Sequence, residues 1–152
     1  MNLDRYELTS GNKLTAFEFV SRGPKGLIPK LVQFTPTNYK DLYNLAFGDK
    51  DADTGQINDI AISNNGDSEQ VLATVVAAVI AFTDRYPNAS IYATGSSKSR
   101  TRLYRMGITK YFQEAKSNFL IYGQIHSEWE PFVIGENYDA FIVQRKLLKF
   151  EI

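Results

Sequence analysis

A basic segment with interleaved hydroxyl groups contains the residues whose types and spacing most suggest chemistry. It spans residues 96–105, and no acidic residue occurs between Arg85 and Gln113. Arginine and hydroxyl groups near a helix start are groups that recognise phosphate. The candidate anion-binding residues of this segment are Ser97, Lys98, Arg100, Arg102 and Arg105. The alternative is a solvated helix face whose arginines pair with acids elsewhere in the chain.

A second candidate for anion binding is the turn Asn64-Asn65-Gly66, between an apolar strand and the start of a helix. The first free N–H groups of a helix can hold an anion, so Asn65 and Gly66 join the candidate anion-binding residues. Asp67 and Glu69 would oppose a phosphate there, but they suit the helix dipole. Ordinary helix capping is therefore the alternative for this turn.

Three aspartates at alternate positions, Asp49, Asp51 and Asp53, resemble the start of a calcium loop. Thr54 stands where the sharp turn needs glycine, and Ile60 stands where the bidentate glutamate is needed. The pattern therefore favours a solvated hairpin loop, and no metal site is predicted.

Histidine and cysteine chemistry is restricted by composition, because the chain has one histidine, His126, and no cysteine. This excludes disulfides, thiolate metal sites and a cysteine nucleophile, and it disfavours a Ser–His–Asp triad. Trp129 and Phe132 flank Pro131 in the same region. They either anchor a loop to the core, or form an aromatic rim to a pocket, or make an oligomer contact.

The overall composition is that of one neutral domain. The chain has 152 residues, of which 43% are hydrophobic, and 17 basic residues balance 17 acidic ones. A whole-protein basic field for nucleic acid is excluded, although a local patch is not. Residues 1–13 lack a signal-peptide core, and the apolar run at residues 71–82 is too short to span a bilayer. We therefore expect a single α+β domain over residues 1–152, cytoplasmic and without a membrane association.

Periodicity and turn residues predict the elements that would position these groups. We expect a long buried helix from about Ser68 to Tyr86, and a short basic helix over Lys98–Met106 that ends at Gly107. Strands are expected at residues 14–20, 28–35, 43–48, 56–63, 90–94, 119–125 and 140–146. A long loop would join the last two strands. This order indicates a mixed, largely antiparallel sheet, with a right-handed crossover between Ile62 and Ile91.

The stretch from Ile57 to Ile108 resembles the central part of the GNAT-type N-acetyltransferases. The parallel lies in the order strand, turn, long helix, strand, helix with Leu103-Tyr104, and Gly107-Ile108. The resemblance implies an acetyltransferase-like arrangement and acetyl coenzyme A as cofactor. It also implies that Tyr104 is the catalytic acid that protonates the thiolate of coenzyme A.

Longer strings resemble a small bacterial family of unknown function over nearly the whole chain. They are Phe19-x-Ser21-x-Gly23-Pro24-Lys25-Gly26, Thr54-Gly55-x-Ile57-x-Asp59, Ser63-Asn64-Asn65-Gly66-Asp67, Arg85-Tyr86-Pro87, Gly95-Ser96-x-x-x-Arg100-Thr101-Arg102-Leu103-Tyr104, Glu136–Phe141 and Gln144-Arg145-Lys146. This resemblance implies one bacterial cytosolic domain, and it brings no established activity.

Two functions follow as expectations, and the sequence leaves open whether the chain is an enzyme. The first is a binding module without a cofactor, whose basic helix contacts RNA, a nucleotide or an acidic protein; a toxin–antitoxin component is one form of it. The second is a divergent coenzyme A-dependent N-acyltransferase. The Gly66 turn and the basic helix are expected at one rim of the sheet, where they would line a small cationic hollow. The oligomeric state is not predicted.

Overall fold

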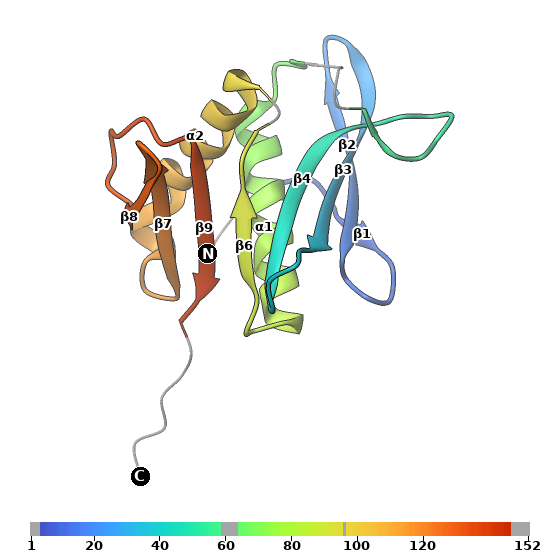
Figure 1. The fold of residues 1–152 in the computed structure, drawn as a ribbon. Coiled ribbons are helices and arrows are strands. Elements are labelled where there is room, and N and C mark those ends of the chain that lie inside the picture. The colour runs from blue at the N-terminus through green and yellow to red at the C-terminus, as the bar shows by residue number, and fades with distance from the viewer. Residues whose placement is uncertain (1–3, 59–63, 96, 147–152) are drawn as a thin grey trace. The chain divides into compact units, whose positions relative to one another are not determined.

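The computed structural model describes residues 4–58, 64–95 and 97–146. Over these residues the chain forms two helices and nine strands whose pairing is mostly antiparallel, so the expected α+β class is confirmed (Figure 1). The chain groups into two units, residues 1–35 with 45–82 and residues 36–44 with 83–152. They are described one after the other. The expectation of a single domain stays a prediction.

Alternating apolar and polar residues form the strands of the first unit. These are β1 (Thr9–Ser10), β2 (Ala16–Gly23), β3 (Gly26–Pro36), β4 (Leu42–Lys50) and β5 (Ile57–Asn58), although Pro36 and residues 42–44 are grouped with the second unit. The pairings of β1 with β2, of β2 with β3 and of β4 with β5 are antiparallel. The hairpin expected around residues 49–55 is confirmed, because Lys50 pairs with Ile57. The predicted crossover strand at Ile62 lies outside the described residues.

Helix α1 (Ser68–Arg85) runs as the sequence predicts, within one residue of the expected end. Asp67 precedes it, Glu69 lies in its first turn, and Pro87 follows it. In the first unit its Phe82 ring stacks on Phe34, with ring centroids 4.2 Å apart. The helix therefore joins the core of this unit through an aromatic contact with β3.

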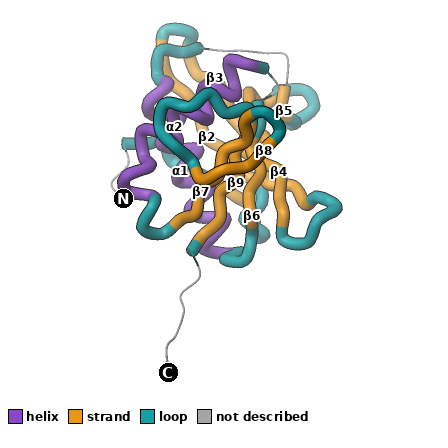
Figure 2. The backbone as a smooth tube through the Cα atoms, turned by 60° about the vertical axis from the view of Figure 1, so that its left-hand side comes forward, coloured by secondary structure: helices purple, strands orange, loops and turns teal. Residues whose placement is uncertain are grey.

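The second unit contains one helix and four antiparallel strands in the order β6-β9-β7-β8 (Figure 2). Their bounds are β6 (Ser90–Ala93), α2 (Lys98–Ala115), β7 (Phe119–Ile125), β8 (Glu128–Pro131) and β9 (Ala140–Arg145). Phe112 of α2 contacts Phe132, and Phe132 contacts Phe141 of β9. The helix therefore lies on the side of the sheet to which Phe141 points.

The prediction of a short basic helix was wrong, because α2 has 18 residues and is as long as α1. Gly107, expected just past the helix end, lies inside α2 and is buried, three residues after the buried Tyr104. In a helix interior, glycine is less favourable than alanine by about 1 kcal/mol. On the buried side of a helix, the close packing that glycine allows offsets this cost. The polar residues from Thr109 onward continue the same helix.

The long loop expected before β9 was also wrong, because residues 128–131 of it form β8. His126 and Ser127 make the turn between β7 and β8, with φ values of 53° and 65°. Two left-handed residues match the twist of a two-residue hairpin, but that turn is usually recognised by asparagine or glycine. Within the described residues, neither helix is both long and apolar enough to cross a membrane.

Candidate functional site

The turn before α2 is held by hydrogen bonds that fix where the helix begins. Ser97 is the N-cap, and its hydroxyl accepts a hydrogen bond from the Arg100 N–H at 3.2 Å. The Thr101 hydroxyl accepts from the Gly95 N–H at 3.0 Å and donates to the Ser97 carbonyl at 3.2 Å. A side chain at position 95 would lie 2.3 Å from the Thr101 nitrogen, so only glycine fits. Ser97, a candidate anion-binding residue, is therefore also the cap of this helix.

The basic side chains lie on the first two turns of α2. Lys98 and Arg102 are exposed, and Arg100 and Arg105 are half-buried. Among the described residues, no carboxylate forms an ion pair with any of these four side chains. The alternative, in which the basic side chains of this helix pair with acids elsewhere, is therefore not seen among the described residues. The first turn of α2 also has no acidic residue.

Tyr104 is the buried member of this part of α2, with 7% of its surface exposed. Burial raises the pKa of its phenol to about 12, and the positive charge of Arg100 opposes that rise. The phenol therefore keeps its proton throughout the neutral range. Its proposed role as an acid depends on a substrate reaching a group that the fold has packed inside.

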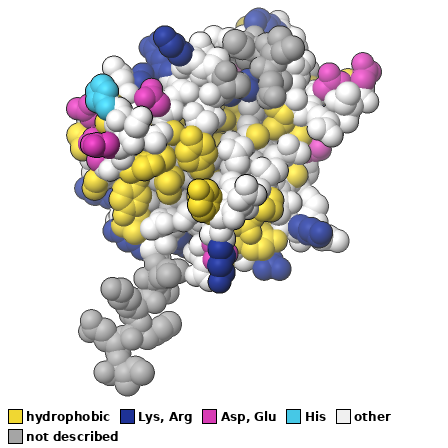
Figure 3. Space-filling model, in the orientation of Figure 1, with side chains coloured by type: hydrophobic (Ala, Val, Ile, Leu, Met, Phe, Trp, Pro, Cys, Tyr) yellow, Lys and Arg dark blue, Asp and Glu magenta, His cyan; other side chains and the backbone are white. Residues whose placement is uncertain are grey.

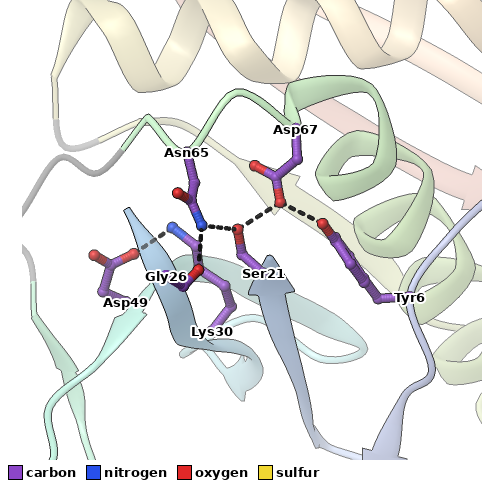
Figure 4. A network of polar contacts seen from close by, with 7 residues as sticks. All are labelled: Tyr6, Ser21, Gly26, Lys30, Asp49, Asn65 and Asp67. Atoms are coloured by element: carbon purple, nitrogen blue, oxygen red, sulfur yellow. Dashed lines mark hydrogen bonds and ion pairs between the residues drawn. The ribbon is translucent and has the colours of Figure 1, made fainter. Parts of the chain in front are cut away.

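The Gly66 turn belongs to the first unit, where its side chains are engaged in a buried polar network (Figure 4). Asn65 is 2% exposed, and its amide donates to the Ser21 hydroxyl at 3.2 Å and to the Gly26 carbonyl at 2.9 Å. Its side-chain oxygen accepts from the Lys25 N–H at 2.7 Å. Gly66 has φ of 74°, a conformation that favours glycine. The Asn65 side chain thus holds the β2–β3 hairpin against the start of α1.

Asp67 extends the same network toward the N-terminal segment. Its Oδ2 accepts from the Ser21 hydroxyl at 2.5 Å and from the Tyr6 phenol at 2.6 Å. Burial raises the pKa of Tyr6, and the hydrogen bond to Asp67 raises it further. Tyr6 and Ser21 were missed from the sequence, because nothing local indicates a partner 61 or 46 residues away.

A buried ion pair between Lys30 and Asp49 lies beside the network in Figure 4. The Lys30 side chain is 6% exposed and also faces the ring of Phe47, 5.9 Å from its centroid. Asp49 is therefore engaged with a lysine. Asp51 accepts from the N–H groups of Thr54 and Asp53, and these two bonds lower its pKa. The acidic loop is organised as a turn, in line with the hairpin interpretation.

No group of three metal-ligating side chains comes together among the residues that the structure describes. His126 is exposed in the β7–β8 turn. Of the two aromatic residues beside Pro131, Phe132 is 5% exposed and anchors the segment to the core. Trp129 is 40% exposed and lies 6.1 Å from Tyr92, measured between ring centroids.

The candidate anion-binding residues are divided between the two units. Asn65 and Gly66 belong to the first unit, and Ser97, Lys98, Arg100, Arg102 and Arg105 belong to the second. Within the second unit the structure brings the five residues together on one helical segment. A common hollow with the Gly66 turn stays a prediction.

Comparison with known proteins gives a family match. The model of DUF6934, a family of unknown function, matches residues 2–146. No curated protein and no solved structure matches the chain.

Proposed function

Since the chain belongs to DUF6934, whose function is unknown, we propose from the site itself that it is an anion-binding module that contacts RNA phosphates through α2. The contacting groups are Lys98, Arg100, Arg102, Arg105 and the hydroxyl of Ser97. A component of a toxin–antitoxin pair is one biological form of such a module.

The observation that carries this proposal is the set of four basic side chains on α2 without an ion-pair partner in the described chain. Arginine presents a planar set of donors that matches phosphate oxygens. From Lys98 to Arg105 the helix rises about 10 Å at ~1.5 Å per residue. That span favours several phosphates of one strand over a single phosphate.

The position of these charges on the helix also supports a ligand. The N-terminus of a helix carries partial positive charge, so basic residues there are unfavourable by a few tenths of a kcal/mol each. Lys98 and Arg100 lie in the first turn of α2, and no acid offsets them. Folding alone does not require this arrangement, whereas an anion bound there would turn the repulsion into attraction.

The test is the binding of a fluorescent single-stranded RNA of mixed sequence, measured by anisotropy at several salt concentrations. We expect the affinity to fall as salt is raised, because bound phosphates release counterions. The triple variant Arg100→Glu, Arg102→Glu and Arg105→Glu should lose at least about a hundredfold in affinity at low salt, through lost contacts and new repulsion.

The matched control reverses three exposed cations outside α2. Arg5→Glu, Lys13→Glu and Lys25→Glu together make the same change in net charge. This control should keep most of the affinity. Equal loss in both triple variants would show a nonspecific charge effect. An unchanged affinity in the α2 variant would eliminate the proposal. If the chain bound ATP or an acidic peptide but not RNA, the ligand of α2 would be a nucleotide or an acidic protein instead.

A coenzyme A-dependent N-acyltransferase is the second candidate, supported by the order of elements. In the described residues α1 precedes β6, α2 follows with Leu103-Tyr104 inside it, and two further antiparallel strands, β7 and β9, pair with each other. This order of elements is what supports the second candidate. In this proposal Tyr104, which keeps its proton at neutral pH, is the acid.

Thermal shift with acetyl coenzyme A tests the second candidate. A ligand that binds the native state raises the melting temperature by mass action. The shift should appear at millimolar ligand and should persist in Tyr104→Phe, which lacks the acid but keeps the ring. No shift at that concentration would dispose of the acyltransferase proposal.

A further inference from the structure

The N-terminal arm, which we define as residues 4–10, contacts the rest of the first unit through Tyr6. The Tyr6 N–H donates to the Thr74 hydroxyl of α1 at 3.0 Å, and its ring stacks on Phe19 of β2 with centroids 5.8 Å apart. The phenol points at Asp67 beside the start of α1, where it donates at 2.6 Å (Figure 4). These residues of β2 and α1 form a pocket for one tyrosine, which we call the Tyr6 pocket, and all of them belong to the first unit.

The arm also supplies the end strand of the sheet, and this strand is short. β1 pairs with two of the eight residues of β2, at Phe17 and Glu18. Farther along β2, the Arg22 N–H donates to the Tyr6 phenol at 3.1 Å. A segment held by one anchor side chain and a two-residue strand opens at a smaller free-energy cost than the whole fold. We therefore expect the arm to open before the rest of the unit.

The turn that joins the arm to β2 contains a strained residue. Leu14 has φ of 53°, and its N–H donates to the Gly11 carbonyl at 3.2 Å. A bulky residue rarely adopts this left-handed conformation. Residues 11–13 are exposed, and the turn projects from the surface of the first unit (Figure 1 and Figure 3). If the turn opens and straightens, the strain at Leu14 is relieved.

These features together favour an exchange of arms between two copies of the chain. An arm that docks on another copy makes the same contacts as in its own chain, so the balance between the two forms depends on the turn and on concentration. A short connection under strain favours the exchanged form. The chain has no net charge, so long-range repulsion between copies is absent.

We propose that the Tyr6 pocket takes the N-terminal arm of a second copy, which gives a homodimer with exchanged arms. A two-fold axis relates the copies, and each one fills the Tyr6 pocket of the other. The strained turn and its Leu14 supply the preference for this form over the closed monomer. This proposal is independent of RNA binding.

The first experiment measures the mass of the chain after refolding at ~100 μM, when an arm can dock on either copy. Light scattering during size exclusion should show a dimer of twice the chain mass of 17.2 kDa. Tyr6→Ala should abolish this dimer, because the docked arms hold it together. The matched control Tyr39→Ala, at a 75% exposed position of the second unit, should keep it. A natural chain that stays monomeric overturns the proposal.

The second experiment uses an engineered disulfide to report where the arm docks, because the chain has no cysteine of its own. Thr9 and Glu18 are Cα partners in β1 and β2, a spacing that a disulfide can bridge. The dimer fraction of the double variant Thr9→Cys, Glu18→Cys is oxidised and run on a denaturing gel without reductant. Exchanged arms should give a covalent dimer, whereas arms docked in their own chain would give a monomer band.

The matched control places the disulfide in a hairpin that does not exchange. Arg22 and Leu27 are Cα partners in β2 and β3. Arg22→Cys with Leu27→Cys should therefore run as a monomer band, even when taken from the dimer fraction. A dimer fraction in which the Thr9 and Glu18 variant also gives a monomer band overturns the proposal, because another surface would then hold the dimer.

The third experiment tests the strained turn. Leu14→Gly should weaken dimerisation at least about tenfold, because glycine removes the strain from the closed monomer at two turns per dimer. The matched control is Asp41→Gly, which removes a similar strain, at φ of 57°, from the second unit. It should leave the dissociation constant of the dimer within about threefold of the natural value. An unchanged dimer in Leu14→Gly would overturn the strained turn as the cause of the exchange.

Discussion

Tyr104 shows how burial sets the chemistry of a single residue. Its phenol is inside the second unit, and the cost of removing a phenolate from water raises its pKa to about 12. The charge of Arg100 favours the phenolate, and it only reduces the rise. Tyr104 therefore keeps its proton at neutral pH, as the acyltransferase proposal requires of its acid.

The first prediction is that Tyr104 makes stability depend on alkaline pH. Because its folded pKa lies above the unfolded value of about 10, the stabilisation is complete below pH 10 and is lost as pH rises toward 12. The loss should reach about 2 to 3 kcal/mol relative to Tyr104→Phe. Urea unfolding of both proteins at pH 8, 10, 11 and 12 measures this loss. If the free energy of unfolding of the natural chain and of Tyr104→Phe changed equally with pH, burial of the phenol would not be its cause.

The second prediction concerns Ser21, which is fully buried between Asn65 and Asp67. Ser21→Ala removes a donor to the carboxylate and an acceptor for the amide. It should reduce the free energy of unfolding by about 1 to 3 kcal/mol, because the amide of Asn65 stays buried and the half-buried carboxylate of Asp67 loses a donor. Ser10→Ala, at an exposed strand position, should change it by less than about 0.5 kcal/mol. Similar values for both would mean that the network contributes nothing.

The candidate site was predictable from the sequence only where its residues are close along the chain. The basic cluster on α2 and its Ser97 cap are local features, and their placement on one helix could be read from spacing. Asn65 was identified as a possible anion ligand, but its side chain bonds to Ser21, Gly26 and Lys25, which lie 39 to 44 residues earlier. Partners at such separations leave no local pattern.

At the scale of elements, α2 begins with charges that its own dipole disfavours. The third prediction is that Lys98→Glu with Arg100→Glu stabilises the protein by about 0.5 to 1 kcal/mol and weakens RNA binding at the same time. Thermal unfolding and RNA anisotropy on the same sample measure the two effects. Loss of both stability and binding would indicate that the basic residues support the fold.

The fourth prediction concerns the contact between β7 and the segment before β9. A Cβ at Gly123 would lie 2.4 Å from the Tyr138 ring, which is 1% exposed and hydrogen-bonded to the Val133 N–H. Gly123→Ala should therefore destabilise the protein by about 3 kcal/mol or more. Gly11→Ala has open space around it and should be nearly neutral. Chemical denaturation of both variants makes the comparison.

The errors in the predicted elements have physical causes. α1 was predicted because an acidic N-terminus and Pro87 mark its ends. α2 was predicted too short because Gly107 has the sequence signature of a helix end, and its burial depends on tertiary packing. β8 was missed because Glu128–Pro131 has two acids and a proline, and its strand conformation comes from pairing with β7.

For the whole molecule, the salt dependence of RNA binding reports how many cations contact the phosphates. The chain has no net charge, and the proposal counts the four cations of α2 as the phosphate contacts. The fifth prediction is a slope of log affinity against log salt no steeper than about −3, from four cations at ~0.7 counterions each on a single strand. A slope twice as steep, measured in the same anisotropy experiment, would show that other surfaces contact the RNA.

The hydrogen bond between Tyr6 and Asp67 joins two residues that the ribosome synthesises at different times. The two residues are 61 positions apart. A ribosome adding ~5 to 20 residues per second needs roughly 3 to 12 s to synthesise the stretch between them. During that interval the emerging hairpin of β2 and β3 carries Ser21 without the carboxylate that completes its network. A chaperone that holds nascent chains would therefore have a window in which to bind this hairpin.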